Sequence, residues 1–217
     1  MTDVTAGAKG NNERMAFVFD RSRVQPSGLA AEIVIPPGWR GELAEDVLVR
    51  QFARTPYAVS FRASDQTFIL VTLHVEFGKS SAERVRELND IARWLREWAD
   101  RSNRWHQSLL AHGDFNIDRR GDKLWEALTA TGLSVPEDLH QVPRTVFSNT
   151  KRPDLDKFYD QIAWFETSSR RRRISLDYAQ GGGFNFLPHV YQNTTMSKAS
   201  ITWRISDHFP LWTEFHL

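Results

Sequence analysis

The stretch Ser108-Leu109-Leu110-Ala111-His112-Gly113-Asp114-Phe115-Asn116 combines a short apolar run with a glycine and two polar residues. The apolar run predicts a buried strand. Gly113 permits a turn or a close approach of the backbone to another group. On an extended segment Asp114 and Asn116 would point to the same side, where a carboxylate beside a carboxamide suits a hard divalent cation and a phosphate oxygen. Such residues also form ordinary turns, and the stretch alone favours that interpretation.

Composition limits the classes to which the protein can belong. The 217 residues are 41% hydrophobic, enough for one sizeable core, and we expect one domain. The net charge of +1 does not indicate a protein that coats nucleic acid, although it permits a local basic patch. The chain has no cysteine, which excludes disulfides, thiolate catalysis and cysteine-ligated zinc. No apolar run reaches the roughly 18 residues that a membrane span requires.

The first twelve residues are polar and rich in glycine. We expect a disordered lead-in over residues 1–12, followed by one domain over residues 13–217. The lead-in lacks the apolar core of a signal peptide, so we expect a cytoplasmic location.

Apolar runs and turn residues predict many strands and a few amphipathic helices. Gly181-Gly182-Gly183 predicts a flexible turn, and Ser64-Asp65 predicts a hairpin between two neighbouring strands. The clearest helix should run from Ser80 to about Asn103, and a second from Lys123 to Thr131. The pattern predicts mixed sheets covered by helices. The expected strands span residues 14–19, 32–35, 57–61, 66–75, 108–111, 158–164, 174–178 and 211–217.

Two later stretches carry polar residues that require an explanation. In the expected strand at 158–164, Asp160 shares a face with Ile162 and Trp164, and an acid beside two apolar residues should have a partner. The motif Ser206-Asp207-His208-Phe209-Pro210 precedes the closing strand. The four arginines at 170–173 favour a solvated loop unless a phosphate comes near.

The order of the polar motifs resembles that of the endonuclease/exonuclease/phosphatase superfamily, specifically its deoxyribonuclease I-like members. This resemblance covers residues 10–217 and implies an α+β fold, a four-layer α/β/β/α sandwich of two packed sheets covered outside by helices. It also implies hydrolysis of phosphodiesters or phosphomonoesters with Mg²⁺ or Mn²⁺. The matching motifs are Glu13-Arg14, Arg54-Thr55-Pro56, Thr72-Leu73-His74, Gly113-Asp114-Phe115-Asn116, Tyr159-Asp160-Gln161-Ile162 and Ser206-Asp207-His208-Phe209-Pro210.

The resemblance implies that Asp114 and Asn116 lie at the scissile phosphate. They would position the attacking water and the phosphate, and Asn116 would contact the phosphate itself. Asp207 and Asp114 would be metal ligands.

The resemblance also implies two carboxylate–histidine pairs. His208 would be held by Asp160 and would contact the phosphate or share in proton transfer. Glu13 and His74 match a second catalytic pair of the nuclease-like branch, and Arg54 matches its phosphate-contacting arginine. Histidine suits proton transfer near pH 7, and a carboxylate partner fixes its tautomer and raises its pKa. Taken alone, each of these residues is better explained by an ordinary structural role. Their occurrence together, in this order, favours the family.

The chain departs from the family pattern at its start. The family opens with two further strands, and the second ends in a Gln-Glu pair whose Glu is the principal metal ligand. Neither strand occurs before Glu13. We therefore expect an N-terminally truncated fold with an uncovered sheet edge, weak Mg²⁺ binding and little activity. We also expect codons upstream of Met1 to encode the missing strands.

Three functions follow as alternatives. The first is a metal-dependent phosphoesterase, in particular a nuclease with nucleic acid as its partner, which Arg54 and the Glu13–His74 pair favour. The second is a catalytically impaired remnant that binds nucleic acid or a protein. The third is a phosphatase of lipid or sugar phosphates.

Overall fold

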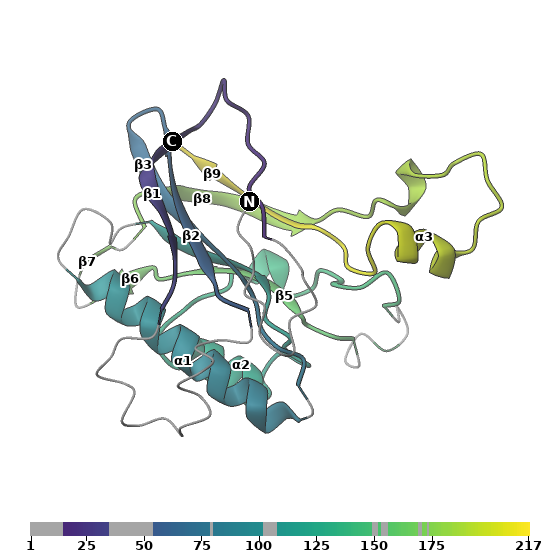
Figure 1. Cartoon of the computed structure of the whole chain (residues 1–217), viewed down its shortest axis with the longest axis horizontal. Helices are drawn as coiled ribbons and strands as arrows, with labels where there is room; N and C mark the ends of the chain where they lie inside the picture. The colour runs from purple at the N-terminus through teal and green to yellow at the C-terminus, as the bar shows by residue number, and fades with distance from the viewer. Residues whose placement is uncertain are drawn as a thin grey trace.

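A computed structural model describes residues 15–34, 54–78, 80–101, 108–148, 152, 156–168, 171–172 and 174–217, with the backbone alone at 167–168 and 171–172. Within these ranges the helices are α1 (Ser81–Asp100), α2 (Lys123–Thr129) and α3 (Lys198–Arg204), with short 3-10 turns η2 (Glu137–Leu139) and η4 (Leu187–His189). The strands are β1 (Gln25–Glu32), β2 (Tyr57–Ala63), β3 (Gln66–His74), β4 (Leu109–Asp114), β5 (Asp160–Trp164), β6 (Thr167–Ser168), β7 (Arg171–Arg172), β8 (Asp177–Gly183) and β9 (Leu211–His216) (Figure 1).

The central feature is a five-stranded sheet in the order β1-β2-β3-β4-β5. β3 and β4 are parallel, and the other neighbours are antiparallel. A parallel pair needs a long crossover, and α1 supplies it. The expected hairpin between β2 and β3 is confirmed and turns at Ser64, which has a positive φ of 53°.

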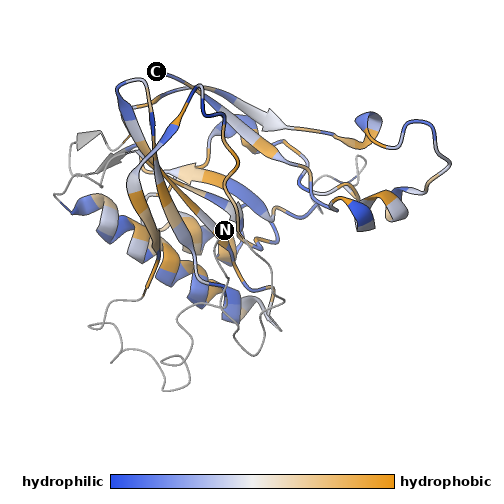
Figure 2. Cartoon of the chain, turned by 45° about the horizontal axis from the view of Figure 1, so that its top comes forward, coloured by the Kyte–Doolittle hydropathy of each residue, from blue (hydrophilic) through white to orange (hydrophobic). Residues whose placement is uncertain are grey.

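α1 and α2 cover one face of this sheet (Figure 1). The buried residues of α1 recur every three or four positions, as one helical face requires, and include Leu88, Leu95 and Ala99. Figure 2 shows hydrophilic and hydrophobic residues alternating around this helix. The same core takes in Val71 and Leu73 of β3. Burying each such side chain contributes roughly 1.5–3 kcal/mol, so this layer stabilises the strands at whose ends the polar motifs lie.

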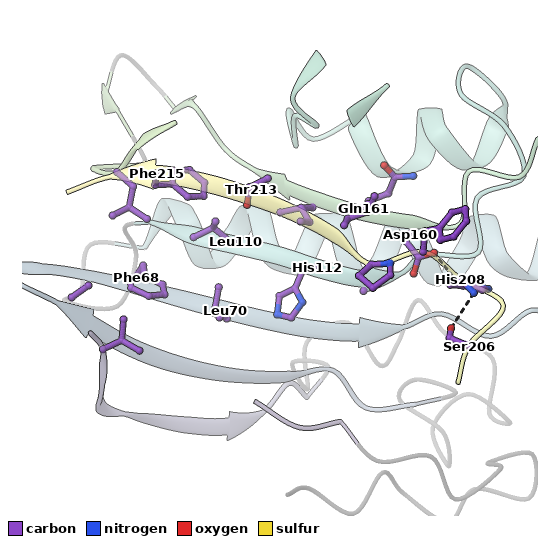
Figure 3. A pocket seen from close by; sticks show the side chains of 18 of the residues that line it. Phe68, Leu70, Leu110, His112, Asp160, Gln161, Ser206, His208, Thr213 and Phe215 are labelled. Carbon is purple, nitrogen blue, oxygen red and sulfur yellow. Dashed lines mark hydrogen bonds and ion pairs between the residues drawn. The ribbon is translucent and has the colours of Figure 1, made fainter. Parts of the chain in front are cut away.

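The β8–β9 pair lies against the other face of the sheet and contacts β5 (Figure 1). A smaller core, which includes Leu110, Trp164 and Leu176, joins the two sheets. Beside it opens a cavity of about 600 Å³ with largely apolar walls, including Phe68 and Phe215 (Figure 3).

His112 points into this cavity (Figure 3). Burial lowers the pKa of His112 to about 4, so the ring is neutral. Its Nε2 has no hydrogen-bond partner within the described residues. Phe17 packs edge-on against this ring with centroids 6.0 Å apart, and the neighbouring Val18 is 99% exposed. The stretch from Phe17 to Phe19 is therefore only partly covered.

Two strands expected near the N-terminus are misplaced. Of the stretch 14–19, the described residues 15–19 form no strand, and Phe17 and Phe19 instead pack their rings on Phe61. The strand expected at 32–35 lies earlier, because β1 ends at Glu32. Pro26 weakens the strand signal of β1, but an edge strand tolerates proline at an irregular register such as the one found here.

The glycine run also differs from its prediction. Gly181-Gly182-Gly183 ends β8 and pairs with β9 instead of forming a flexible turn. A Cβ on Gly182 would lie 2.9 Å from the Trp212 ring, so a side chain there would displace the tryptophan. The strand that was expected at 174–178 begins later than predicted, at Asp177.

The helix layer, the five-stranded sheet and the second sheet confirm the α+β class and the packing of two sheets. Among the described residues, no helix has the length and apolar character to cross a membrane.

Gly113 lies opposite Leu73 in the parallel β3–β4 pair. Its φ of +134° disfavours side chains, and an added Cβ would overlap the Leu73 carbonyl oxygen. The close approach expected from the sequence is therefore found within the sheet, one residue before β4 ends.

We predict that Gly113→Ala lowers the free energy of unfolding by at least about 3 kcal/mol, because strained backbone costs roughly 1–3 kcal/mol before the overlap is added. Gly121→Ala is the matched control, since Gly121 has a φ of +80° and open space around it. Its cost should be about 1–2 kcal/mol. Urea unfolding measures both variants, and equal losses would contradict the close approach.

Candidate active site

Three strand ends bring the polar motifs together at one edge of the sheet. His74 lies opposite Asp114 in the β3–β4 pair, and Asp114 lies opposite Asp160 in the β4–β5 pair. His74 Nε2 is 3.5 Å from Asp114 Oδ2. Sheet register thus places an imidazole and two carboxylates in one row, although the three residues come from distant parts of the chain.

His208 reaches this row from the loop before β9. Its Nδ1 lies 2.7 Å from Asp160 Oδ2, and its backbone N–H donates to Ser206 Oγ (Figure 3). The bridge between Thr145 and His208 fixes the loop. The partner expected for Asp160 on the apolar side of β5 is therefore His208.

Charge and burial shift two of these groups in directions that suit acid–base chemistry. The hydrogen bond to Asp160 raises the pKa of His208 to about 9 against the opposing effect of burial, with help from the charges of Asp160, Asp114 and Asp207. Burial and then the Asp160 charge raise the pKa of Asp114 above its ordinary value. The site therefore pairs a cationic imidazole with a carboxylate of increased basicity near neutral pH.

Asn116 differs from its expected geometry. It has a positive φ of 50°, so the segment after Asp114 is not extended. Asn116 is only 4% exposed, and its side-chain amide donates to the Val75 carbonyl at 2.6 Å. The backbone N–H of Asn116 donates to Asp114 Oδ1 at 2.8 Å. Asn116 therefore orients the Asp114 carboxylate from the inside.

Arg84 of α1 holds the same loop and was missed by the sequence analysis. Its guanidinium donates to the Asn116 carbonyl at 2.9 Å and to Asp118 Oδ2 at 2.7 Å. Arg84 is buried, so these bonds compensate a desolvated charge. At helical spacing Arg84 looked like a residue of the solvated helix face, and only its tertiary partners show otherwise.

Arg144 supports the Asp160 side of the site and was also missed. It is fully buried, donates through Nε to the Asp160 carbonyl at 2.9 Å and lies 4.0 Å from the centroid of the Phe158 ring. Its Nη1 donates to the carbonyls of Leu139 and Val142, and its Nη2 donates to Gln161 Oε1 at 3.4 Å. Burial lowers the pKa of Arg144 to about 10, which leaves it charged at neutral pH.

The other expected site residues lie as follows. Glu13 falls outside the described residues, and His74 has Asp114 as one partner. Arg54 precedes β2, which begins opposite Thr72, so Arg54 lies toward the sheet edge at which β3 ends. Asp207 is exposed next to His208, and its carbonyl accepts the Val146 N–H.

The donor set does not by itself make a metal site. Within the described part of the chain there is no group of three or more His, Cys, Asp or Glu side chains that could hold a metal ion. Mg²⁺ normally takes one or two carboxylates plus substrate and water oxygens. Asp114 and Asp207 would supply the two carboxylates of such a site, with the remaining ligands from water and substrate.

Comparison with known proteins gives one curated relative. No family model matches the chain. A deoxyribonuclease of Thioalkalivibrio sp. (strain K90mix) is 32% identical over 174 residues, which cover 76% of this chain and 44% of that protein. The chain thus spans less than half the length of this relative.

Solved structures share the fold at low sequence identity. TDP2 of D. rerio, complexed with a single-strand DNA product, has a TM-score of 0.54 at 15% identity over 91% of this chain and 70% of its own. A mannosyl-6-phosphatase of Bacteroides thetaiotaomicron has a TM-score of 0.53 at 14% identity over 92% and 69%. An endonuclease/exonuclease/phosphatase family protein of the same species has a TM-score of 0.53 at 15% identity over 91% and 65%. The chain therefore shares the fold of the deoxyribonuclease I-like proteins of the endonuclease/exonuclease/phosphatase superfamily.

Proposed function

We propose that the protein is a phosphoesterase, and specifically a nuclease that hydrolyses phosphodiester bonds. The observation that carries this proposal is the carboxylate–imidazole pair, Asp160 with His208, beside Asp114 on the neighbouring strand. The relative named deoxyribonuclease supports a nucleic-acid substrate.

The chain's own residues supply an acid and a base for in-line displacement. Asp114 would take a proton from the attacking water as the water oxygen bonds to phosphorus. The bond from phosphorus to the leaving oxygen would break as that oxygen takes a proton from His208. Before this transfer the imidazolium would stabilise negative charge on the phosphoryl group. Asp160 would hold the ring orientation and Asn116 the Asp114 carboxylate.

We also keep Mg²⁺ or Mn²⁺ as a proposed cofactor, with Asp114 and Asp207 as its ligands. A bound divalent ion would neutralise phosphoryl charge. These two carboxylates would leave the other positions on the ion to water and to substrate oxygens.

The second candidate is a binding module for nucleic acid or protein without catalysis, which would need no metal ion. Assays on single-stranded and duplex DNA, RNA, and lipid or sugar phosphates, with Mg²⁺ or Mn²⁺ added, separate the alternatives. Hydrolysis of the phosphodiesters supports the nuclease. Hydrolysis of phosphomonoesters alone would replace it with a phosphatase, and no hydrolysis in any assay would favour the binding module.

We predict that His208→Ala reduces kcat for phosphodiester hydrolysis by about 10²- to 10⁴-fold, because removing a general acid or base has that effect. His216→Ala is the matched control, since His216 is an exposed histidine on β9, and it should retain wild-type kcat. Near wild-type turnover in His208→Ala would remove His208 from the mechanism.

The pH dependence of kcat/KM tests the pairing with Asp160. The wild-type rate should fall on the basic side around pH 9, because the His208 imidazolium, with its pKa raised to about 9, loses its proton there. In Asp160→Asn the residual rate should fall nearer pH 6.5, about the ordinary histidine value. If the fall of kcat/KM on the basic side lies at the same pH in Asp160→Asn as in the wild type, a group other than His208 controls that fall.

A further inference from the structure

Two aromatic side chains, Tyr159 and Phe77, form a row of ring contacts that begins at His208. The Tyr159 ring stacks on the His208 imidazole with centroids 5.5 Å apart and an angle of 14° between the planes. Phe77, just beyond β3, makes an edge contact with Tyr159, with centroids 6.5 Å apart. Phe77 is 57% exposed, so most of its surface faces solvent beside the site.

The third aromatic residue, Phe147, approaches His208 from a different segment. Thr145 bridges to His208, and the Val146 N–H donates to the Asp207 carbonyl at 2.9 Å. Phe147 is the next residue and is 54% exposed. Exposed aromatic side chains therefore follow both segments that flank the reacting imidazole.

A cationic group lies near each of these rings. Within about 6 Å of a ring centroid a cation is attracted by the ring electrons, and the same cation can attract a phosphate. The three pairs are Arg84 with Phe77 at 5.0 Å, Lys157 with Tyr159 at 5.8 Å, and Lys198 with Phe147 at 5.5 Å.

Asp118 pairs with two of these cations, Arg84 and Lys157, at 2.7 Å each. These two contacts hold both cations beside Phe77 and Tyr159. The segment 178–206, which contains Lys198, has no acidic residue. The surroundings of Lys198 and Phe147 thus suit a polyanion.

We propose that the site takes an unpaired nucleic-acid strand, whose bases stack on Phe77 and on Phe147 while the phosphodiester between them lies at His208. Proteins that bind single strands combine cationic grooves with aromatic stacking platforms, because every base has a ring face to offer. In a duplex those faces are already stacked on one another. The inference rests on the proposed function, since it places the phosphodiester at the Asp160–His208 pair.

Binding by the 217-residue chain tests the inference without hydrolysis. The probe is a fluorescein-labelled single-stranded oligonucleotide, as DNA or RNA, in EDTA, with a hairpin duplex of the same sequence as comparison. The single strand should bind more tightly than the duplex. Phe77→Ala and Phe147→Ala should each weaken single-strand binding about 5- to 150-fold, the loss of one stacked base, and leave duplex binding unchanged.

Trp203→Ala is the control for non-specific stacking. Trp203 is 86% exposed on α3, which extends away from the two sheets (Figure 1). This variant should bind the single strand like the wild type, and circular dichroism should show all three variants folded. Equal affinity for single strand and duplex would overturn the inference. So would folded Phe77→Ala and Phe147→Ala variants that bind normally, or a Trp203→Ala loss as large as theirs.

A second substrate separates this inference from the proposed function. Hydrolysis of an abasic oligonucleotide, a chain of phosphodiesters without bases, should be unaffected by Phe77→Ala and Phe147→Ala, whereas both should raise KM for the ordinary oligonucleotide. If the wild type hydrolyses no ester yet binds single strands through both phenylalanines, the enzyme proposal fails and the binding site stands. If the abasic strand is hydrolysed but the phenylalanines do not affect KM for the ordinary oligonucleotide, the enzyme stands and this inference fails.

Discussion

β4 lies so close to β3 at Gly113 that any side chain there would overlap the Leu73 carbonyl oxygen. This approach is part of the register in which His74, Asp114 and Asp160 lie opposite one another on three neighbouring strands. Because side chains alternate between faces, a shift of one residue would turn Asp114 to the opposite side of the sheet. The reacting groups therefore depend on backbone pairing near the ends of these strands, while His208 and Asn116 come from loops.

Two buried arginines support this arrangement from behind. Arg84 bonds to the loop that contains Asn116, and Arg144 bonds to the backbone of Asp160. Both guanidiniums are removed from water, so they are stable only while their partners remain in place. Fixed charges of this kind let the site keep its geometry without help from a substrate. Arg84 also places a positive charge near the end of β4 that carries Asp114, and Arg144 places one near the end of β5 that carries Asp160.

The predictability of the fold from sequence varies along the chain. β2, β3, α1, β4 and β9 follow apolar patterns strong enough to predict, and each was found near its expected range. The position predicted for β1 was wrong because Pro26 and Gly28 weaken the strand pattern in the sequence. This edge strand is stabilised instead by pairing with β2. The glycines of β8 were interpreted as a turn because their actual reason, the Trp212 ring packed against them, comes from another strand.

The site shows the same division between local pattern and tertiary contact. The Asp160–His208 contact was expected from motif order, and an acid on an apolar face required some partner. The roles of Arg84 and Arg144 could not be predicted, since nothing in their local sequence distinguishes them from surface arginines. Asn116 was expected on an extended segment, but its left-handed backbone turns it inward to Val75. Motif order therefore indicates which residues meet, whereas packing determines what each one contacts.

A crystal structure of the protein soaked with orthophosphate or orthovanadate would locate the reacting phosphoryl group. The account predicts that the anion lies within hydrogen-bond reach of His208 Nε2 and next to the Asp114 carboxylate, with the Asp160–His208 contact of 2.7 Å retained. Anion density elsewhere on the surface, with the His208 pocket empty or the imidazole turned away from Asp160, would contradict it.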